Sequence, residues 1–482
     1  MPSTPVPVEA PAAAPLPVAG PDQLLAVLRE AGTGRGDAVS LAVDLARRPD
    51  RSVPVGVATS AGCWSLAAAP EVAVRALRSV EDALRPRWVW WSAGATATQL
   101  VAAGLRVATC WDVAAVHRLL VGGAADDPAR VWAALHGLDL STIPRTGQLD
   151  LLGAGAAPGA VPSDPGVVKA PADNAAAAAA MPDPEGPLEP DGHLRADWAD
   201  DGWRRSPDRA ARWARTALIA RDLQERRLAE GPDPQRRRST AHAESAAALL
   251  CVELTATGLP IDVAGAERLV TEAAGPRPRD AAHEAELRRA RDDAVLRHLP
   301  DGGAGVDLRN PVSVRTALSR AGFDVPDTRS WRLEPWRGSS ALVDALLSWR
   351  KAERVATTYG YGWLDRHVGP DGRLRGAWSA SDGAGGRMTA QAGLHNLPAE
   401  LRPAVAAEPG RVLVRADLGQ VEPRVLAAVS GDPALAAATR EDDLYAPVAA
   451  RLGVDRAVAK VAVLAAMYGQ TSGTAGQALA GL

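Results

Sequence analysis

The stretch "RVLVRADLGQVEPRVLAAVSGDP" constrains the fold more than any other part of this chain. An apolar run rich in β-branched residues ends in one carboxylate, Asp417, and predicts a strand over residues 411–417. The chain then takes up an apolar pattern of helical period that carries Glu422 and Arg424, which predicts a helix. An acid in this place is often just the N-cap of the following helix, so other stretches have to decide its role.

Composition limits the possible partners. The 482 residues, 47% of them hydrophobic, suffice for more than one core. A net charge of −3 gives no overall attraction to polyanions, so any nucleic-acid surface has to be a local patch. Only three basic residues are lysines (Lys169, Lys351 and Lys460), which gives a lysine within a motif extra weight.

Cysteine usage and the N-terminal stretch predict the compartment. Cys63, Cys110 and Cys251 are odd in number and follow no metal-ligand spacing, which indicates a reducing cytoplasm. The sequence contains no apolar run near the roughly 20 residues of a membrane span and no secretion signal at its start. We therefore expect a cytoplasmic protein without a membrane partner, and nothing in the sequence indicates oligomerisation.

The apolar pattern predicts an α/β region followed by a mainly helical one. Residues 1–20, rich in Pro and Ala, predict a disordered lead. Residues 21–150 alternate between helix and strand patterns and predict a mixed sheet, and residues 153–192 predict a linker or insert. The predicted strands lie in "AVSLAVDLA", "SVPVGVAT", "RWVWWSAG" and "LRVATC". The predicted helices lie in "PDQLLAVLREAG", "PEVAVRALRSVEDAL" and "VAAVHRLLVGG".

After the linker, the pattern is mostly helical. "SPDRAARWARTALIARDLQERRLAE" predicts a helix, "DPQRRRST" a charged loop, and "AHAESAAALLCVELTATG" a helix that stops at Gly258. A short strand pattern returns in "RLRGAWSA". Further helices fit Gly265–Leu299, Pro311–Ala321, Ser340–Asp365 and Val454–Met467.

The stretch "DLGQVEPRVLAAVSGDP" resembles motif A of the family A DNA polymerases, the bacterial DNA polymerase I group. The residues that hold family positions relative to Asp417 are Gln420, Glu422, Arg424, Val425, Leu426, Ala427, Ser430, Gly431 and Asp432. The resemblance implies that Asp417 is catalytic and binds Mg²⁺, since two such ions roughly 3.5–4 Å apart stabilise the charge that develops on phosphate oxygens. It also implies that Gln420 and Glu422 line the nucleotide site, with Glu422 crowding the sugar 2′ position, and that Arg424 contacts DNA.

A second stretch, "RAVAKVAVLAAMYG", places Arg456, Lys460, Leu464 and Tyr468 four residues apart on one helical face. Two cations followed by flat side chains suit a triphosphate and a base, although an amphipathic helix with two solvated basic residues has the same pattern. The stretch resembles motif B, the fingers helix of the same family. Arg456, Lys460, Tyr468 and Gly469 match that motif, whereas Leu464 replaces the family's aromatic residue and stacks less well on a base.

Weaker matches extend the resemblance over residues 241–482, as thumb, part of the palm and fingers helix. "GRMTAQAGLHNLP" is similar to a family segment in which Arg387 and Asn396 would contact template and primer. "SWRKAERVATTY" resembles a thumb helix whose arginines, Arg350 and Arg354, would meet duplex phosphates, or would simply be solvated.

The resemblance implies an α/β plus α+β protein, with a ribonuclease-H-like, exonuclease-type domain at residues 21–240. Proofreading needs a cluster of carboxylates. Asp44 holds the place of the first acid, but Ala46 replaces the glutamate, and the helix that should present Tyr and Asp carries Arg and Ala. Asp112 also fits a helix cap. We therefore expect this domain to have lost its metal site.

A second departure concerns the family's His-Asp-Glu hairpin, which should follow the fingers helix at some distance. The chain stops at Leu482, so the second carboxylate ligand is not present in it, and we expect a truncated piece of a longer product. The leading hypothesis is a template-directed DNA polymerase acting on primer–template DNA and deoxynucleoside triphosphates. The alternative is a non-catalytic binder of primer–template and nucleotide; a nuclease is disfavoured by the missing acids.

Overall fold

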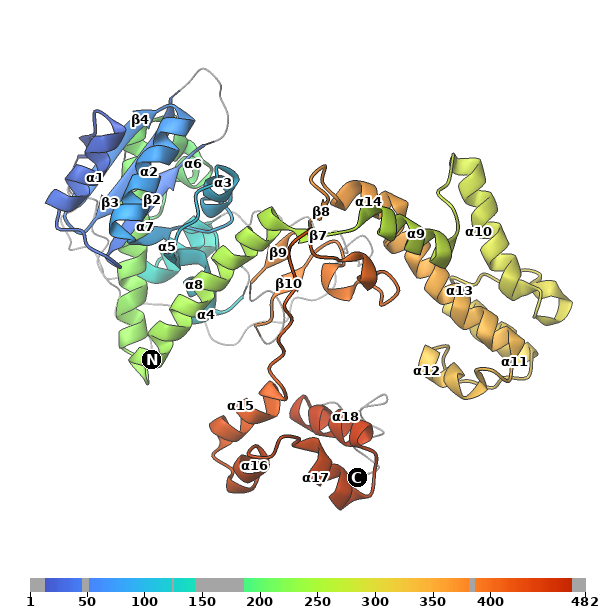
Figure 1. Cartoon of the computed structure of the whole chain (residues 1–482). Helices are drawn as coiled ribbons and strands as arrows, with labels where there is room; N and C mark the ends of the chain where they lie inside the picture. Colours follow the sequence, from blue (N-terminus) through green and yellow to red (C-terminus); the bar gives the residue numbers. More distant parts are fainter. Residues whose placement is uncertain (1–13, 46–51, 124, 144–185, 381–385, 470–482) are drawn as a thin grey trace. The chain divides into compact units, whose positions relative to one another are not determined.

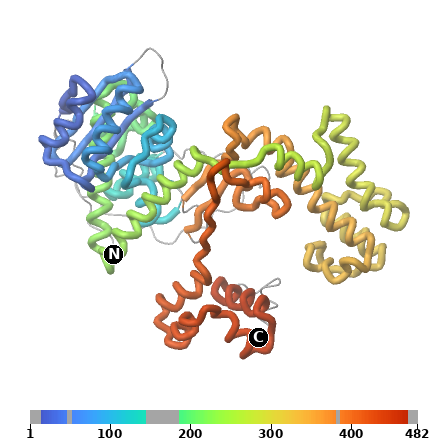
Figure 2. The backbone as a smooth tube through the Cα atoms, in the orientation of Figure 1, coloured from blue at the N-terminus to red at the C-terminus, as the bar shows by residue number. Residues whose placement is uncertain are grey.

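The computed structural model describes residues 14–45, 52–123, 125–143, 186–380 and 386–469. The chain divides into two compact units, Met1–Ala406 and Ala407–Leu482, which are described one after the other (Figures 1 and 2). In the part of the chain that the structure describes, no helix combines the length and apolar character needed to cross a bilayer.

The first unit begins with a six-stranded mixed sheet in the order β1-β4-β3-β2-β5-β6 (Figure 1). Strands β2, β3 and β4 form an antiparallel meander, β5 and β6 run parallel to β2, and β1 runs parallel to β4. The strands are β1 (Leu16–Pro17), β2 (Ala38–Val43), β3 (Val53–Thr59), β4 (Gly62–Ala68), β5 (Arg87–Trp90) and β6 (Thr109–Asp112). The mixed sheet agrees with the pattern of the sequence.

The two faces of this sheet bury different kinds of side chain. Along β3, Val55 and Val57 join the core under α1 and α2, while Ala58 joins the core under α7. Small residues on the α7 face let the helix come close: a Cβ on Gly56 would lie 2.0 Å from the backbone carbon of Ala210. The helices that cover the sheet are α1 (Pro21–Glu30), α2 (Pro70–Leu84) and α7 (Pro207–Ala229).

Several expectations for this region need correction. The expected disordered lead is wrong for Leu16–Pro17, which pair with β4 as β1, while residues 1–13 lie outside the described residues. Strand β4 escaped prediction because "GCWSLAA" mixes small and polar residues, although it pairs with β3 along its whole length. The strand predicted in "LRVATC" forms later, at Thr109–Asp112. The predicted linker lies outside the described residues from 153 to 185.

The charged stretch "DPQRRRST" is helical and not a loop. Asp233 caps the first turn of α8 (Pro234–Thr257) by accepting the Arg236 N–H at 3.1 Å, and Pro234 suits the first helical position. The other helices near the sheet are α3 (Ala97–Ala102), α4 (Val113–Val121), α5 (Pro128–His136) and α6 (Ala196–Ala199).

The rest of the first unit is helical, with short two-stranded ladders. Two predicted helices are each divided, since the chain turns at Gly275 with a φ of 100° and again at Tyr359–Gly360. The helices are α9 (Val263–Ala274), α10 (Ala281–Leu296), α11 (Pro311–Arg320), α12 (Ser330–Leu333), α13 (Ala341–Thr358) and α14 (Tyr361–His367). The ladders pair β7 (Leu259–Pro260) with β8 (Arg373–Leu374) and β9 (Trp378–Ser379) with β10 (Thr389–Ala390).

The second unit, red in Figure 2, contains α15 (Val421–Ser430), α16 (Pro433–Ala438), α17 (Tyr445–Leu452) and α18 (Arg456–Met467). The helix predicted after Asp417 is confirmed as α15, and the helix predicted at Val454–Met467 is confirmed as α18. The strand predicted at residues 411–417 is wrong: residues 411–418 have no ladder partner among the described residues, and Val412 and Val414 are 82% and 88% exposed. An apolar, β-branched run becomes a strand only when a neighbouring strand takes up its backbone hydrogen bonds.

Candidate functional site

Asp417, the expected metal ligand, is exposed within the extended segment that leads into α15. Across the described ranges, the structure contains no group of three or more His, Cys, Asp or Glu side chains that could hold a metal ion. The structure therefore places one carboxylate at this point without a cluster around it.

Gln420 ties the start of α15 to the segment before α17. Its backbone adopts a left-handed conformation with φ 56°, which costs a non-glycine residue about 1–2 kcal/mol. Three contacts accompany this conformation: Oε1 accepts the Leu444 N–H at 2.8 Å, and Nε2 donates to the Asp442 carbonyl at 3.3 Å and to Asp443 Oδ1 at 3.4 Å. Its side chain thus connects the start of α15 to residues 442–444 within the protein.

Glu422 and Tyr468, predicted from two separate stretches, are in direct contact. The Tyr468 hydroxyl donates a hydrogen bond to Glu422 Oε1, although 46 residues separate the two. Glu422 also helps to raise the pKa of buried Tyr445, for which burial is the larger cause. The beginning of α15 and the end of α18 therefore meet within one unit.

Arg456 is the first residue of α18 and forms a two-pronged ion pair with Asp443. Its Nε donates to Asp443 Oδ2 and its Nη2 donates to Oδ1 at 3.2 Å. This pairing lowers the pKa of Asp443 and raises that of Arg456. Lys460 is exposed one turn further along, and Leu464 is half-buried, so both lie on the α18 stripe that the sequence predicts.

Arg424 is engaged with the protein's own backbone. Its guanidinium donates to the carbonyls of Gly419 at 3.2 Å, Thr439 and Glu441 at 3.2 Å. In this structure Arg424 holds the turn after α16 through three of its five N–H donors, and its contact with DNA stays a prediction.

In the first unit, the structure brings Arg354 and Asn396 together. Arg354 Nη2 donates to the Asn396 carbonyl at 2.9 Å, and both residues line a cavity of about 350 Å³ with Lys351, His395 and Arg402.

The two other predicted DNA contacts differ in their surroundings. Arg350 is half-buried and donates to the Thr328 carbonyl, and burial lowers its pKa. These contacts fit a residue that stabilises the fold better than one that binds DNA at the surface. Arg387 is exposed just before β10.

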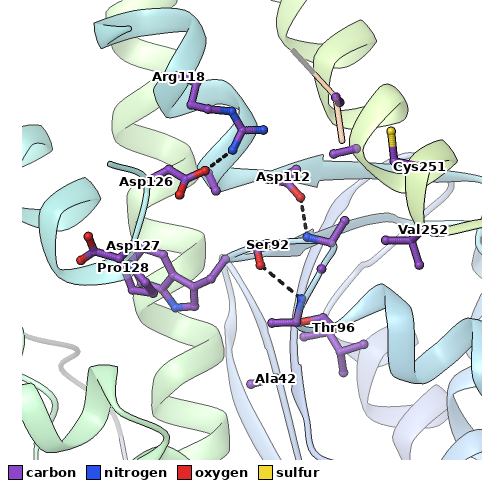
Figure 3. Close-up of a pocket in the computed structure, with 18 of the residues that line it drawn as sticks. Ala42, Ser92, Thr96, Asp112, Arg118, Asp126, Asp127, Pro128, Cys251 and Val252 are labelled. Carbon is purple, nitrogen blue, oxygen red and sulfur yellow. Dashed lines mark hydrogen bonds and ion pairs between the residues drawn. The ribbon is translucent and has the colours of Figure 1, made fainter. Parts of the chain in front are cut away.

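A cavity of about 830 Å³ opens where β5 and β6 end (Figure 3). Asp112 lies in its wall, is 1% exposed and caps α4: Oδ1 accepts the Ala115 N–H at 2.8 Å and Oδ2 accepts the Ala93 N–H at 2.5 Å. Burial raises the pKa of Asp112 to about 6. The helix-cap interpretation of this residue is therefore confirmed.

The other acids around this cavity have partners within the protein. Asp126 pairs with Arg118, as Figure 3 shows. Asp127 caps α5 by accepting the Arg130 N–H at 3.1 Å. Asp201 pairs with the Arg204 guanidinium at 3.0 Å. Asp44, which follows β2 and is not one of the lining residues, lies 3.8 Å from the same guanidinium. Ala46 lies outside the described residues.

Asp443 is the main residue that sequence reasoning missed. It lies in the unremarkable acidic stretch "REDDLY", between the two stretches that carried the prediction. The one signal in the sequence was its negative charge, which could pair with Arg456 at the start of the last helix. Glu441 and Asp442 carry the same charge, so the sequence did not single out Asp443.

Comparisons with known proteins find similarity to DNA polymerases. The family model of DNA polymerase family A matches residues 319–480. The thermostable DNA polymerase I of Thermus filiformis is 32% identical over 163 residues, which is 30% of this chain and 19% of that protein. DNA polymerase I of Chloroflexus aurantiacus is 35% identical over 141 residues, 26% of this chain and 15% of that protein.

In fold, the chain is similar to the POL domain of Pol1 from M. smegmatis, solved in complex with DNA primer-template and dNTP. The TM-score is 0.57 at 17% identity, over 96% of this chain and 73% of that one. The fold is thus the mixed α/β fold seen in a polymerase domain. Residues 319–480 match the family model of DNA polymerase family A. The chain spans less than a fifth of the length of the curated relatives it matches.

Proposed function

We propose that this chain serves template-directed DNA synthesis, in which a primer 3′-hydroxyl takes a nucleotide from a deoxynucleoside triphosphate. One observation carries the proposal: α15 and α18, whose sequences match the two nucleotide-handling motifs independently, meet in one compact unit through Glu422 and Tyr468. The family match over the same region supports it.

The residues of the second unit have separate roles in this proposal. Arg456 and Lys460, one helical turn apart, bind and orient the triphosphate through charge-assisted hydrogen bonds. Tyr468 and half-buried Leu464 shape the pocket for the base. Glu422, held by the Tyr468 hydroxyl, restricts the space at the sugar. Gln420 supports the site and does not contact the nucleotide in this proposal, because its side chain is hydrogen-bonded to residues 442–444.

Magnesium is the ion we propose for Asp417, and the described residues fit it only in part. Mg²⁺ takes one or two carboxylates together with substrate phosphates, so a single aspartate supplies one ligand. Since no three-ligand cluster occurs within the described ranges, we assign no step to the ion.

Primer–template DNA is the proposed partner of the first unit. Arg354, Lys351 and Arg402 line one cavity with Asn396. Glu400 lines it too and pairs with Lys351 at 3.5 Å, so the cavity keeps an excess of basic side chains on a chain of net charge −3. Exposed Arg387 is the second proposed contact. Arg350 and Arg424 fit this role less well than exposed Arg354. Arg350 is half-buried against the Thr328 carbonyl, and half-buried Arg424 donates to three backbone carbonyls.

The sheet domain is proposed to be an exonuclease-type, ribonuclease-H-like domain without proofreading. Its antiparallel β2-β3-β4 meander, followed by β5 and β6 parallel to β2, supports the fold. The acids that line the cavity at the ends of β5 and β6 are bound to arginines or backbone N–H groups, which supports the loss of a metal site. The three free, buried cysteines support a reducing, cytoplasmic setting.

Primer extension tests the proposal. Labelled primer–template, Mg²⁺ and the four deoxynucleoside triphosphates are added to the full chain and to its Asp417→Ala variant. We expect extension by the wild type and loss of at least about a hundredfold in the variant, the scale of losing a group that stabilises transition-state charge. Asp432→Ala, which changes an acid that caps α16, is the matched control. Extension by Asp417→Ala at the rate of an active wild type contradicts the role of Asp417, whereas no extension by either protein favours the second candidate below.

A second candidate is a binder of primer–template and nucleotide without chemistry. The lone carboxylate at the exposed segment before α15 favours it. This candidate predicts salt-dependent binding of primed DNA without extension.

A further inference from the structure

Asp443 connects three parts of the second unit at one carboxylate. Oδ1 accepts the Tyr445 N–H at 3.0 Å at the start of α17 and receives Gln420 Nε2 at 3.4 Å from the start of α15. Both oxygens accept from Arg456 at the start of α18. Neither the family match nor the sequence motifs assign a role to this residue.

Arg456 needs such a partner to hold one position. It begins α18, where the helix dipole is positive and disfavours a cation. Its side chain is 55% exposed, and a long exposed side chain samples many rotamers unless it is held. The Asp443 side chain is only 30% exposed and is itself held by the Tyr445 N–H, so it can fix the guanidinium.

The ion pair leaves part of the guanidinium for another anion. A guanidinium has five N–H donors, and the pair uses one on Nε and one on Nη2. The group also lies over the Tyr445 ring, with the guanidinium carbon 5.7 Å from the ring centroid. The ring and the carboxylate together restrict its orientation.

We propose that Asp443 is a positioning residue that fixes Arg456 for the triphosphate of the incoming nucleotide. The inference rests on the proposed function, because Arg456 is there the residue that binds the triphosphate. A competing effect has the opposite sign: a carboxylate near a triphosphate repels it, so a counter-ion that merely blocks Arg456 would weaken nucleotide binding. The sign of the effect of removing Asp443 therefore decides between positioning and blocking.

A double-mutant cycle on the full chain tests the proposal. The binding of a fluorescent deoxyadenosine triphosphate is measured at equilibrium in Mg²⁺ buffer for the wild type, Asp443→Ala, Arg456→Ala and the double variant. We expect Asp443→Ala to weaken binding about two- to fivefold, the range of a partly exposed ion pair. We expect no further weakening when the change is added to Arg456→Ala, since the residue acts through Arg456.

Asp442→Ala is the matched control. It removes the same charge one residue earlier, and Asp442 meets Gln420 only through its main-chain carbonyl, so the ion pair of Arg456 stays in place. Binding as in the wild type is expected for this variant.

Each contrary result has a distinct meaning. Unchanged or tighter binding by Asp443→Ala, with weaker binding by Arg456→Ala, overturns the positioning role and leaves the proposed function standing. Equal weakening in the Arg456→Ala background shows that Asp443 acts only on the fold, which also overturns the inference. Wild-type affinity in Arg456→Ala contradicts the proposed role of Arg456 and the inference with it.

Discussion

Replacing Glu353 by glutamine should loosen the packing of α10 against α13. The Glu353 side chain is 11% exposed and receives Arg309 Nη2 at 2.6 Å and Arg291 Nε at 3.3 Å. Arg309 also donates to Asp292 at 2.8 Å, and Asp292 accepts the Trp349 indole N–H at 2.8 Å. This charge cluster joins α10, the segment before α11, and α13.

The magnitude follows from the burial of the cluster. Breaking a buried pair by removing one charge costs about 3–5 kcal/mol, because the remaining charge is left without compensation. Glutamine keeps one acceptor oxygen, and Arg309 is 25% exposed, so we expect a loss of about 2–3 kcal/mol, somewhat below that scale.

Hydrogen exchange measures this loss locally. A change of about 2–3 kcal/mol speeds amide exchange in α10 and α13 roughly 30- to 150-fold under conditions in which opening is at equilibrium. The control is Glu334→Gln, which breaks an exposed pair with Arg337 and should leave these helices unchanged. Equal exchange in Glu353→Gln and the control would refute the reasoning.

Two further predictions concern the sheet domain. Gly56→Ala should lower the free energy of unfolding by at least about 3 kcal/mol, because the new methyl group meets the α7 backbone, and denaturant unfolding with a near-wild-type midpoint would contradict this. Asp112 has a folded pKa of about 6 against an ordinary value of 3.8, so the folded state holds its proton more tightly and loses stability as pH rises through that interval. The stability of the wild type relative to Asp112→Asn should fall by up to about 3 kcal/mol between pH 4 and pH 7, and a constant difference would exclude the shift.

Much of the fold could be predicted where periodicity and end signals coincide. The pattern in "PEVAVRALRSVEDAL" gives α2 with the bounds Pro70–Leu84, and α15 and α18 appear where their apolar stripes predict them. The prediction of a strand before Asp417 is wrong for a physical reason. Its pattern shows that the segment can pair, but pairing depends on a neighbour that a local pattern does not contain.

The sequence predicts which residues belong to the candidate site, but not the contacts that these residues make with one another. Spacing identifies Arg456 and Lys460, and motif order identifies Glu422 and Tyr468. Neither spacing nor motif order shows that Arg424 and Arg350 each donate to backbone carbonyls, or that Asp443 supplies the counter-ion of Arg456. Such long-range partners depend on how the helices pack, which single stretches do not encode.

The most direct test of the central claim is whether the chain selects a nucleotide by template. A primer ended by a dideoxynucleotide is bound to the chain in Mg²⁺ buffer, and its dissociation is followed with the nucleotide that pairs with the next template base or with one that does not. We expect that the paired triphosphate alone slows dissociation, and that Lys460→Ala abolishes the difference. Equal dissociation with both nucleotides would contradict a template-directed polymerase site in this chain.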